Sequence, residues 1–198
     1  MPRLVDHAER REAIISAAWR LIAARGIDGI NMRDLAAEAG YSNGALSHYF
    51  SGKDEILQSA FEHVLVATNN RIAASSHGLR GLRALRKVCL EIMPSTEEAR
   101  LEARIAISLW QRALTDRQME SVNNTAVREW RALMARHIDE AVADGEANAC
   151  DAAVQANALM NMMIGLQVSA VLDRGATTRK SQLAMLDAAI DSFTTDHT

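Results

Sequence analysis

Helix-breaking residues are scarce throughout this chain. Only 2 prolines and 10 glycines occur among its 198 residues. Aromatic residues, which favour strands together with the β-branched ones, make up just 4%. Alanine, leucine, methionine, glutamate and arginine, which all favour helices, are abundant instead. The sequence therefore predicts an all-α fold.

The composition bounds the class of protein further. Apolar residues make up 48% and the net charge is only −3, so the chain can bury enough surface to fold rather than stay disordered. Its 2 cysteines, Cys89 and Cys150, exclude a disulfide scaffold and are expected to be reduced. The N-terminus mixes acids and bases without an apolar run, so we expect no signal peptide and a cytoplasmic protein.

One segment could be mistaken for a membrane span. Ala152–Leu172 contains no charged residue and is long enough to cross a bilayer at about 1.5 Å per residue. It also contains polar residues that hydrocarbon disfavours, namely Gln155, Asn157, Asn161, Gln167 and Ser169. We therefore expect a buried helix of a soluble protein, either in a dimer interface or at the centre of a helical domain.

Periodicity, caps and breakers predict about nine helices and no strand. Asn31 and Ser42 are expected caps, and Pro94, Gly145 and a loop at 175–178 separate later helices. The expected helices cover approximately residues 8–25, 32–39, 43–50, 54–75, 82–92 and 152–172. Three more are expected between the capping boxes that begin at Ser95 and Thr115, between the second box and Gly145, and after the loop at 175–178.

The early helices have the spacing of a helix-turn-helix unit. A short helix at 32–39, a turn through Gly40 and a second helix at 43–50 match the plan in which the second helix enters the major groove of DNA. Apolar residues would hold the two helices together, namely Leu35, Ala36, Ala39, Leu46 and Phe50.

The outward face of residues 43–50 has small hydrogen-bonding groups, an imidazole and a phenol, but no Glu or Lys. Such groups suit phosphates and base edges, although a solvated helix is the alternative interpretation. Arg33 could reach a guanine or a phosphate, and Lys53 stands at a helix start that favours an anion. The candidate face consists of Asn43, Ala45, Ser47, His48 and Tyr49.

Three stretches then carry a family resemblance: residues 29–36 (GINMRDLA), 39–50 (AGYSNGALSHYF) and 53–57 (KDEIL). Over roughly residues 8–57 the chain resembles the TetR family of repressors, and SHYF at 47–50 is similar to the choline-responsive Bet-type subgroup. Carried over by position, the resemblance implies DNA contacts from Asn31, Arg33, Ser42, Asn43, Ala45, His48, Tyr49 and Lys53. Ser47 departs from the family, which usually has a phosphate-contacting tyrosine there.

The resemblance also implies an organisation. Residues 1–52 would form the DNA-binding domain, extending into a linking helix at 53–75, and residues 53–198 would bind the effector and dimerise through the last two helices. We therefore expect a homodimeric, ligand-responsive repressor that leaves a roughly palindromic double-stranded operator when a small molecule binds. The alternative is a helical small-molecule sensor or carrier that does not bind DNA.

Candidate pocket residues combine adaptable methionines with aromatic and polar groups, although each could equally be ordinary core. The few aromatic residues after position 61 offer little for a cation cage, so choline itself is not assigned. The candidates are Met93, Trp110, Trp130, Met134, His137, Met163 and Gln167.

Motifs of catalysis are missing from the sequence. It has no GxGxxG, Walker, GxSxG or HExxH pattern and no Glu-x-x-His spacing for a di-metal site in a bundle. We therefore expect no enzyme activity, no metal and no cofactor.

Overall fold

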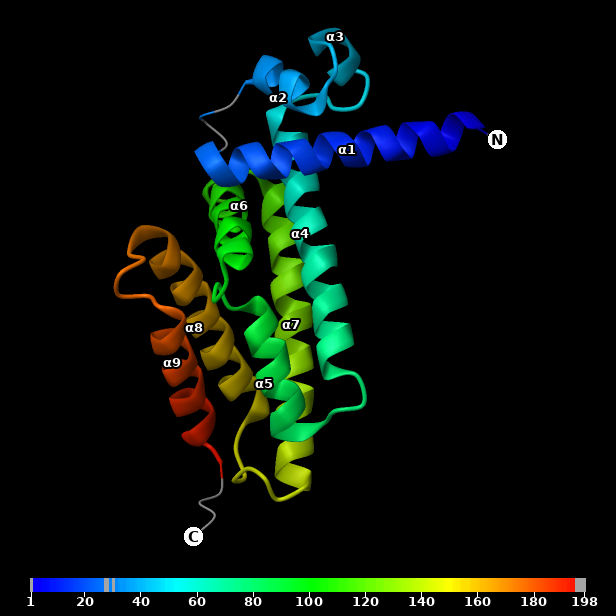
Figure 1. The fold of residues 1–198 in the computed structure, drawn as a ribbon. Helices are drawn as coiled ribbons and strands as arrows, with labels where there is room; N and C mark the ends of the chain where they lie inside the picture. Colours follow the sequence, from blue (N-terminus) through cyan, green and yellow to red (C-terminus); the bar gives the residue numbers. More distant parts are fainter. Residues whose placement is uncertain (1, 27–28, 30, 195–198) are drawn as a thin grey trace. The chain divides into compact units, whose positions relative to one another are not determined.

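The computed structural model describes residues 2–26, 29 and 31–194, and this part of the chain is built from nine α-helices (Figure 1). The predicted all-α class is confirmed, and the only β-type pairing among these residues is an isolated bridge between Ala147 and Thr194. The helices are α1 (Pro2–Arg25), α2 (Met32–Ala39), α3 (Asn43–Leu46), α4 (Lys53–Ser76), α5 (Gly81–Ile92), α6 (Glu97–Ala113), α7 (Arg117–Ala143), α8 (Ala152–Leu172) and α9 (Arg179–Asp191).

The third helix is shorter than expected. It ends at Leu46 instead of Phe50, and residues 47–49 continue as turns. His48 N and Tyr49 N donate to carbonyls three residues earlier, at 3.2 and 3.0 Å, which tightens the coil beyond α-helical geometry. We call residues 43–50 the recognition segment, because its helix and turns together occupy the place of the predicted second helix.

The chain divides into two compact units. The first comprises Met1–Val66 and Arg104–Glu120, and the second comprises Ala67–Ala103 and Ser121–Thr198. The first unit thus extends beyond residue 52. The boundary that the sequence suggested there separates DNA binding from effector binding, and it remains a prediction.

In the first unit, α1 packs against α2 and α2 packs against α3. The amphipathic pattern of each helix turns its apolar side chains to a shared core, to which the first half of α4 also contributes. Fully buried members of this core include Ile14, Ala18, Ile22, Leu35, Leu46, Ile56, Leu57 and Ala60.

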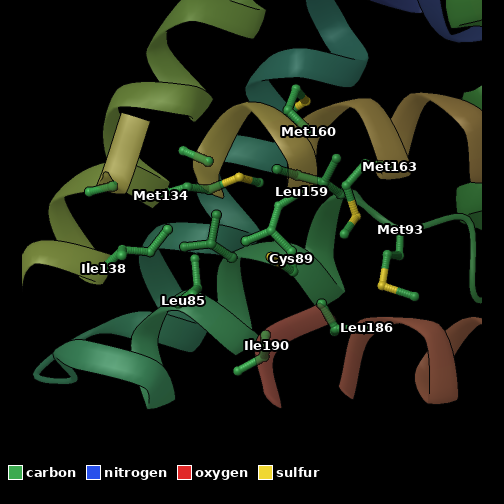
Figure 2. Packing of buried hydrophobic residues seen from close by; sticks show 14 of the residues in the cluster. Leu85, Cys89, Met93, Met134, Ile138, Leu159, Met160, Met163, Leu186 and Ile190 are labelled. Atoms are coloured by element: carbon green, nitrogen blue, oxygen red, sulfur yellow. The ribbon is translucent and has the colours of Figure 1, made fainter. Parts of the chain in front are cut away.

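In the second unit, α5, α8 and α9 pack together with parts of α4 and α7 around a sulfur-rich core (Figure 2). Cys89 lies within it, and burial raises the pKa of its thiol to about 12, so the group stays a neutral hydrophobe. Both Cys89 and Cys150 are free cysteines. The labelled core in Figure 2 includes Leu85, Met93, Met134, Ile138, Leu159, Met160, Met163, Leu186 and Ile190.

The uncharged helix α8 has two different faces. One face is buried in the second unit through residues such as Leu159, Met163 and Ala170, whereas Val154 and Leu172 on the same helix are exposed. None of the described helices, α8 included, is long and apolar enough to span a bilayer.

Candidate DNA-reading site and ligand cavity

The turn between α2 and α3 is fixed by local hydrogen bonds. The side chain of Asn31 accepts a hydrogen bond from Asp34 N at 2.9 Å, and the Ser42 hydroxyl accepts one from Ala45 N at 3.2 Å. Gly40 adopts a left-handed conformation with φ of 75°, which lets Tyr41 N donate to the Ala36 carbonyl at 2.8 Å. Both caps and the glycine turn are therefore where the sequence predicted them.

Buried apolar side chains hold the inner side of this corner. Leu35, Ala36, Leu46 and Phe50 are all almost inaccessible, as predicted, while Ala39 is only partly buried. These contacts turn the opposite side of the recognition segment to solvent.

The structure exposes most of the predicted DNA-reading side chains. Ser47 donates its hydroxyl proton to the Gly44 carbonyl at 2.9 Å, and the rings of Tyr41 and Tyr49 lie 6.4 Å apart. The side chain of Asn43 lies outside the described residues. Asn31, Arg33, Ser42, Ser47 and His48 are exposed, and Ala45, Tyr49 and Lys53 are partly buried.

These groups can serve as hydrogen-bond donors and acceptors for DNA. Hydroxyl, imidazole and guanidinium groups all suit phosphate oxygens or base edges, and the start of α4 at Lys53 offers an N-terminus that favours an anion. A two-helix corner with one buried side and one polar, exposed side defines a helix-turn-helix regulator of transcription.

Comparison with known proteins identifies the family. Residues 14–60 match the family of bacterial regulatory proteins named tetR, and residues 82–195 match the C-terminal domain of BetI-type transcriptional repressors. The chain belongs to the TetR family and has a BetI-type C-terminal domain. It is a DNA-binding transcription regulator of a repressor family and not an enzyme, which excludes the alternative of a carrier that does not bind DNA.

Individual relatives agree with this assignment. The chain is 31% identical to the HTH-type transcriptional regulator PksA of Bacillus subtilis over 174 residues, which cover 87% of this chain and 84% of that protein. It is 23% identical over 199 residues to the HTH-type transcriptional regulator BetI of Burkholderia ambifaria, covering 96% and 97% of the two proteins.

Solved structures share the fold. A transcriptional regulator from Saccharomonospora viridis, crystallised in complex with choline, superposes with a TM-score of 0.90 at 24% identity and covers 95% of this chain and 99% of that chain. A transcriptional regulator from Rhodococcus gives a TM-score of 0.81, also at 24% identity, with 92% and 94% covered.

The predicted ligand-pocket residues are only partly brought together. Met93, Met134 and Met163 are fully buried in the core of the second unit (Figure 2). Trp130 packs beside this core and donates its indole proton to Asn69 Oδ1 at 2.7 Å. Trp110 belongs to the first unit, so the structure does not group it with the others.

Two further pocket candidates make polar contacts inside the second unit. His137 Nδ1 lies 2.8 Å from Glu140 Oε2, and this hydrogen bond holds the pKa of Glu140 below its ordinary value. The same Glu140 oxygen accepts a hydrogen bond from Gly81 N, so His137 helps anchor the start of α5. Gln167 donates to the Ile92 carbonyl at 3.3 Å, and its Oε1 is buried without a partner in the described chain.

A charged cavity that sequence reasoning missed lies in the second unit. Its volume is about 170 Å³, and of the predicted pocket residues only Met93 borders it. Arg71 crosses one wall, where its two terminal nitrogens lie 3.0 and 2.9 Å from the carboxylate oxygens of Glu102 and its Nε lies 3.3 Å from Glu91. Together with Glu98, these residues give the lining three carboxylates and one guanidinium.

Burial affects the electrostatics of this cavity. It raises the pKa of Glu102, and the hydrogen bonds from Arg71 only partly oppose this effect. Sequence patterns do not reveal these ion pairs, because they join residues far apart in the chain.

Proposed function

We propose that this regulator is a cytoplasmic homodimer that represses transcription from a roughly palindromic operator and releases it when a small molecule binds in the second unit. The ligand would favour a dimer whose two recognition segments no longer match successive major grooves. The observation that carries the proposal is the polar, exposed side of the recognition segment opposite its buried one.

Within that proposal, the DNA contacts come from residues on α2, the recognition segment and the start of α4. Exposed side chains at Arg33, Ser42 and His48 support base or phosphate contacts, and Tyr49 follows His48 directly. We assign these contacts to Asn31, Arg33, Ser42, Asn43, Ala45, Ser47, His48, Tyr49 and Lys53.

Binding to a duplex selected from a random pool by the wild-type protein tests these contacts. Arg33→Ala should reduce discrimination by about 1–3 kcal/mol if Arg33 contacts a base. Lys53→Ala should weaken binding to all duplexes alike if Lys53 contacts a phosphate. The salt slope, which is the dependence of the logarithm of the affinity on the logarithm of the salt concentration, should then fall by about 1. Arg83→Ala, which removes an exposed basic side chain from α5, is the control. Unchanged affinity and salt slope in both variants would contradict the assignment.

The dimer interface is proposed on the exposed faces of α8 and α9. Val154 and Leu172 on α8 and Met185 on α9 are large apolar side chains with 58%, 80% and 49% of their surfaces exposed. The two helices contact each other in the second unit and lie side by side in Figure 1, so these exposed apolar side chains belong to neighbouring helices. Covering such a surface with the same surface of a second copy would bury it in a closed, two-fold assembly.

We further propose a small organic cation as the effector. The Saccharomonospora viridis neighbour binds choline, and carboxylates outnumber basic groups in the cavity beside Arg71. A cavity of about 170 Å³ suits a molecule of that size. The remaining pocket candidates of the second unit, Trp130, Met134, His137, Met163 and Gln167, stay proposed contacts for a larger ligand, whereas Trp110 of the first unit is not among them.

A thermal-shift titration tests the effector class. Choline should raise the melting temperature, since ligand at about 100 times its Kd stabilises the native state by about 2.7 kcal/mol. Its neutral carbon isostere, 3,3-dimethyl-1-butanol, should have little effect, and Glu91→Gln should weaken the response to choline. Equal stabilisation by both compounds would contradict a cation site.

A further inference from the structure

The end of the recognition segment is held by a side chain from α1. Phe50, the last residue of the segment, has only 2% of its surface exposed. The guanidinium carbon of Arg11 lies 4.8 Å from the centre of the Phe50 ring, within the range of a cation–π interaction. Arg11 Nη2 also donates to the Ser59 hydroxyl on α4 at 3.1 Å. Arg11 therefore links α1 and α4 to the last ring of the segment.

A carboxylate from the first turn of α4 holds the next residue. Glu55 Oε2 accepts hydrogen bonds from the backbone nitrogen of Ser51 at 2.8 Å and from the Ser51 hydroxyl at 2.9 Å. These bonds, followed by the weaker contact of Arg11 with Glu55 Oε1 at 3.5 Å, hold the pKa of Glu55 below its usual value. Glu55 is therefore ionised near neutral pH, and an ionised acceptor makes the stronger hydrogen bond.

The recognition segment needs such external support. Its only α-helical part, α3, has 4 residues, and a helix that short is not stable on its own. Ser42 caps its beginning, while Phe50 and Ser51 fix its end. His48 and Tyr49, which are proposed to contact DNA, lie immediately before that fixed end.

We propose that Arg11 and Glu55 are positioning residues for DNA recognition: acting through Phe50 and Ser51, they hold the recognition segment in the orientation that binds DNA. The inference rests on the proposed DNA-reading role of the segment. It assigns to Arg11 and Glu55 no contact with DNA of their own.

Glu55 offers a test in which a positioning role and a simple charge effect predict opposite changes in the affinity for DNA. Removing an acid near a polyanion should tighten binding through electrostatics alone. If Glu55 positions the segment, Glu55→Ala should instead weaken binding to the selected operator about tenfold, comparable to one lost charge-assisted hydrogen bond.

A neighbouring acid provides the matched control. Asp54 lies in the same first turn of α4 and pairs with Arg112 at 3.3 Å instead of with the recognition segment. Asp54→Ala should leave operator affinity unchanged or raise it slightly. Glu55→Gln, which keeps the side-chain length, should weaken binding in the same direction as Glu55→Ala and serves if the alanine variant does not fold.

Arg11 is tested by keeping its charge and removing its planar group. Arg11→Lys cannot reproduce both the stack on Phe50 and the hydrogen bond to Ser59, so its operator affinity should fall while the salt slope stays unchanged. A direct phosphate contact would instead survive in the lysine variant. Hydrogen exchange of residues 43–51 in the free protein should be faster in Arg11→Lys and Glu55→Ala, but unchanged in Asp54→Ala.

Three results would overturn the inference. These are operator affinity at or above the wild-type value in the Glu55 variants, full affinity in Arg11→Lys, or lost affinity without faster exchange in the segment. If the wild-type protein selects no duplex from the pool, the proposed DNA-reading role itself fails. If the wild-type protein binds a selected duplex and the variants bind it equally tightly, only the positioning role fails.

Discussion

The side-chain amide of Gln182 donates a hydrogen bond of 3.1 Å to the backbone carbonyl of Pro94. Gln182 has no exposed surface, and its amide nitrogen also donates to the Thr177 carbonyl at 3.2 Å. One side chain near the start of α9 thus satisfies two carbonyls, one of them at the break between α5 and α6. The other side-chain atom, Oε1, is buried without a hydrogen-bond partner in the described chain.

This arrangement makes Gln182 a sensitive position for stability. Gln182→Leu should lower the free energy of unfolding by about 1–3 kcal/mol, because it leaves two carbonyls without their donor. The loss of stability is limited because the substitution also removes the buried, unpaired Oε1. Urea denaturation measures the change, with Gln155→Leu on α8, a partly exposed position, as the control. Equal effects of the two substitutions would contradict the structural role of Gln182.

The glycine turn of the helix-turn-helix unit gives a matched pair of substitutions. Gly40 has φ of 75°, whereas Gly44 lies within α3 and has no atom near the place of an added Cβ. Gly40→Ala should cost about 1 kcal/mol because alanine is strained in the left-handed region. Gly44→Ala should be neutral or stabilising by up to about 1 kcal/mol, because alanine loses less backbone freedom in a helix. Thermal unfolding followed by circular dichroism measures both, and destabilisation by Gly44→Ala alone would contradict this assignment.

The buried carboxylate of Glu102 predicts a pH dependence. Its folded pKa is raised above the ordinary value of 4.5, so between these two values the folded state binds more protons than the unfolded state. Its contribution to stability therefore falls as the pH rises through that window and stays low above it. Glu102→Gln removes this dependence. The stability of the variant relative to wild type should rise as the pH increases above 4.5 and then level off.

Denaturation curves at several pH values measure this difference. Glu129→Gln, which removes an exposed acid from α7, is the control and should leave the pH dependence of stability nearly unchanged. Parallel stability curves for wild type and Glu102→Gln would show that the raised pKa of Glu102 has no energetic effect.

The helix-turn-helix unit could be predicted because its signals are local. The Asn31 and Ser42 side chains each accept a hydrogen bond from the backbone nitrogen three residues ahead. Gly40 itself adopts the left-handed conformation that the turn requires. The length of α3 was predicted incorrectly, since the tightening after Leu46 comes from hydrogen bonds that leave no pattern in residue type.

The cavity could not be predicted for the opposite reason. Arg71 and Glu102 belong to different helices and meet only after α4 and α6 have packed, so their pairing has no spacing rule. Gln182 likewise reaches Pro94 across a large sequence separation. For the methionines, composition predicted an adaptable apolar interior, and Met93 alone of the predicted set borders the cavity.

The dimer proposal predicts the effect of a charge on the exposed face of α8. Gly165 is exposed, with no atom within 4 Å of an added Cβ, so arginine fits there without disturbing the second unit itself. Ala170 is fully buried in the same helix, and a charge there would unfold the chain instead. Light scattering of Gly165→Arg should therefore give the mass of a folded 21.7 kDa monomer. Losing the second half-site contact should weaken operator binding by about 10²-fold or more. Ala132→Arg, on the exposed side of α7, should stay dimeric, and a dimer that survives both Gly165→Arg and Leu172→Glu would show that the interface lies elsewhere.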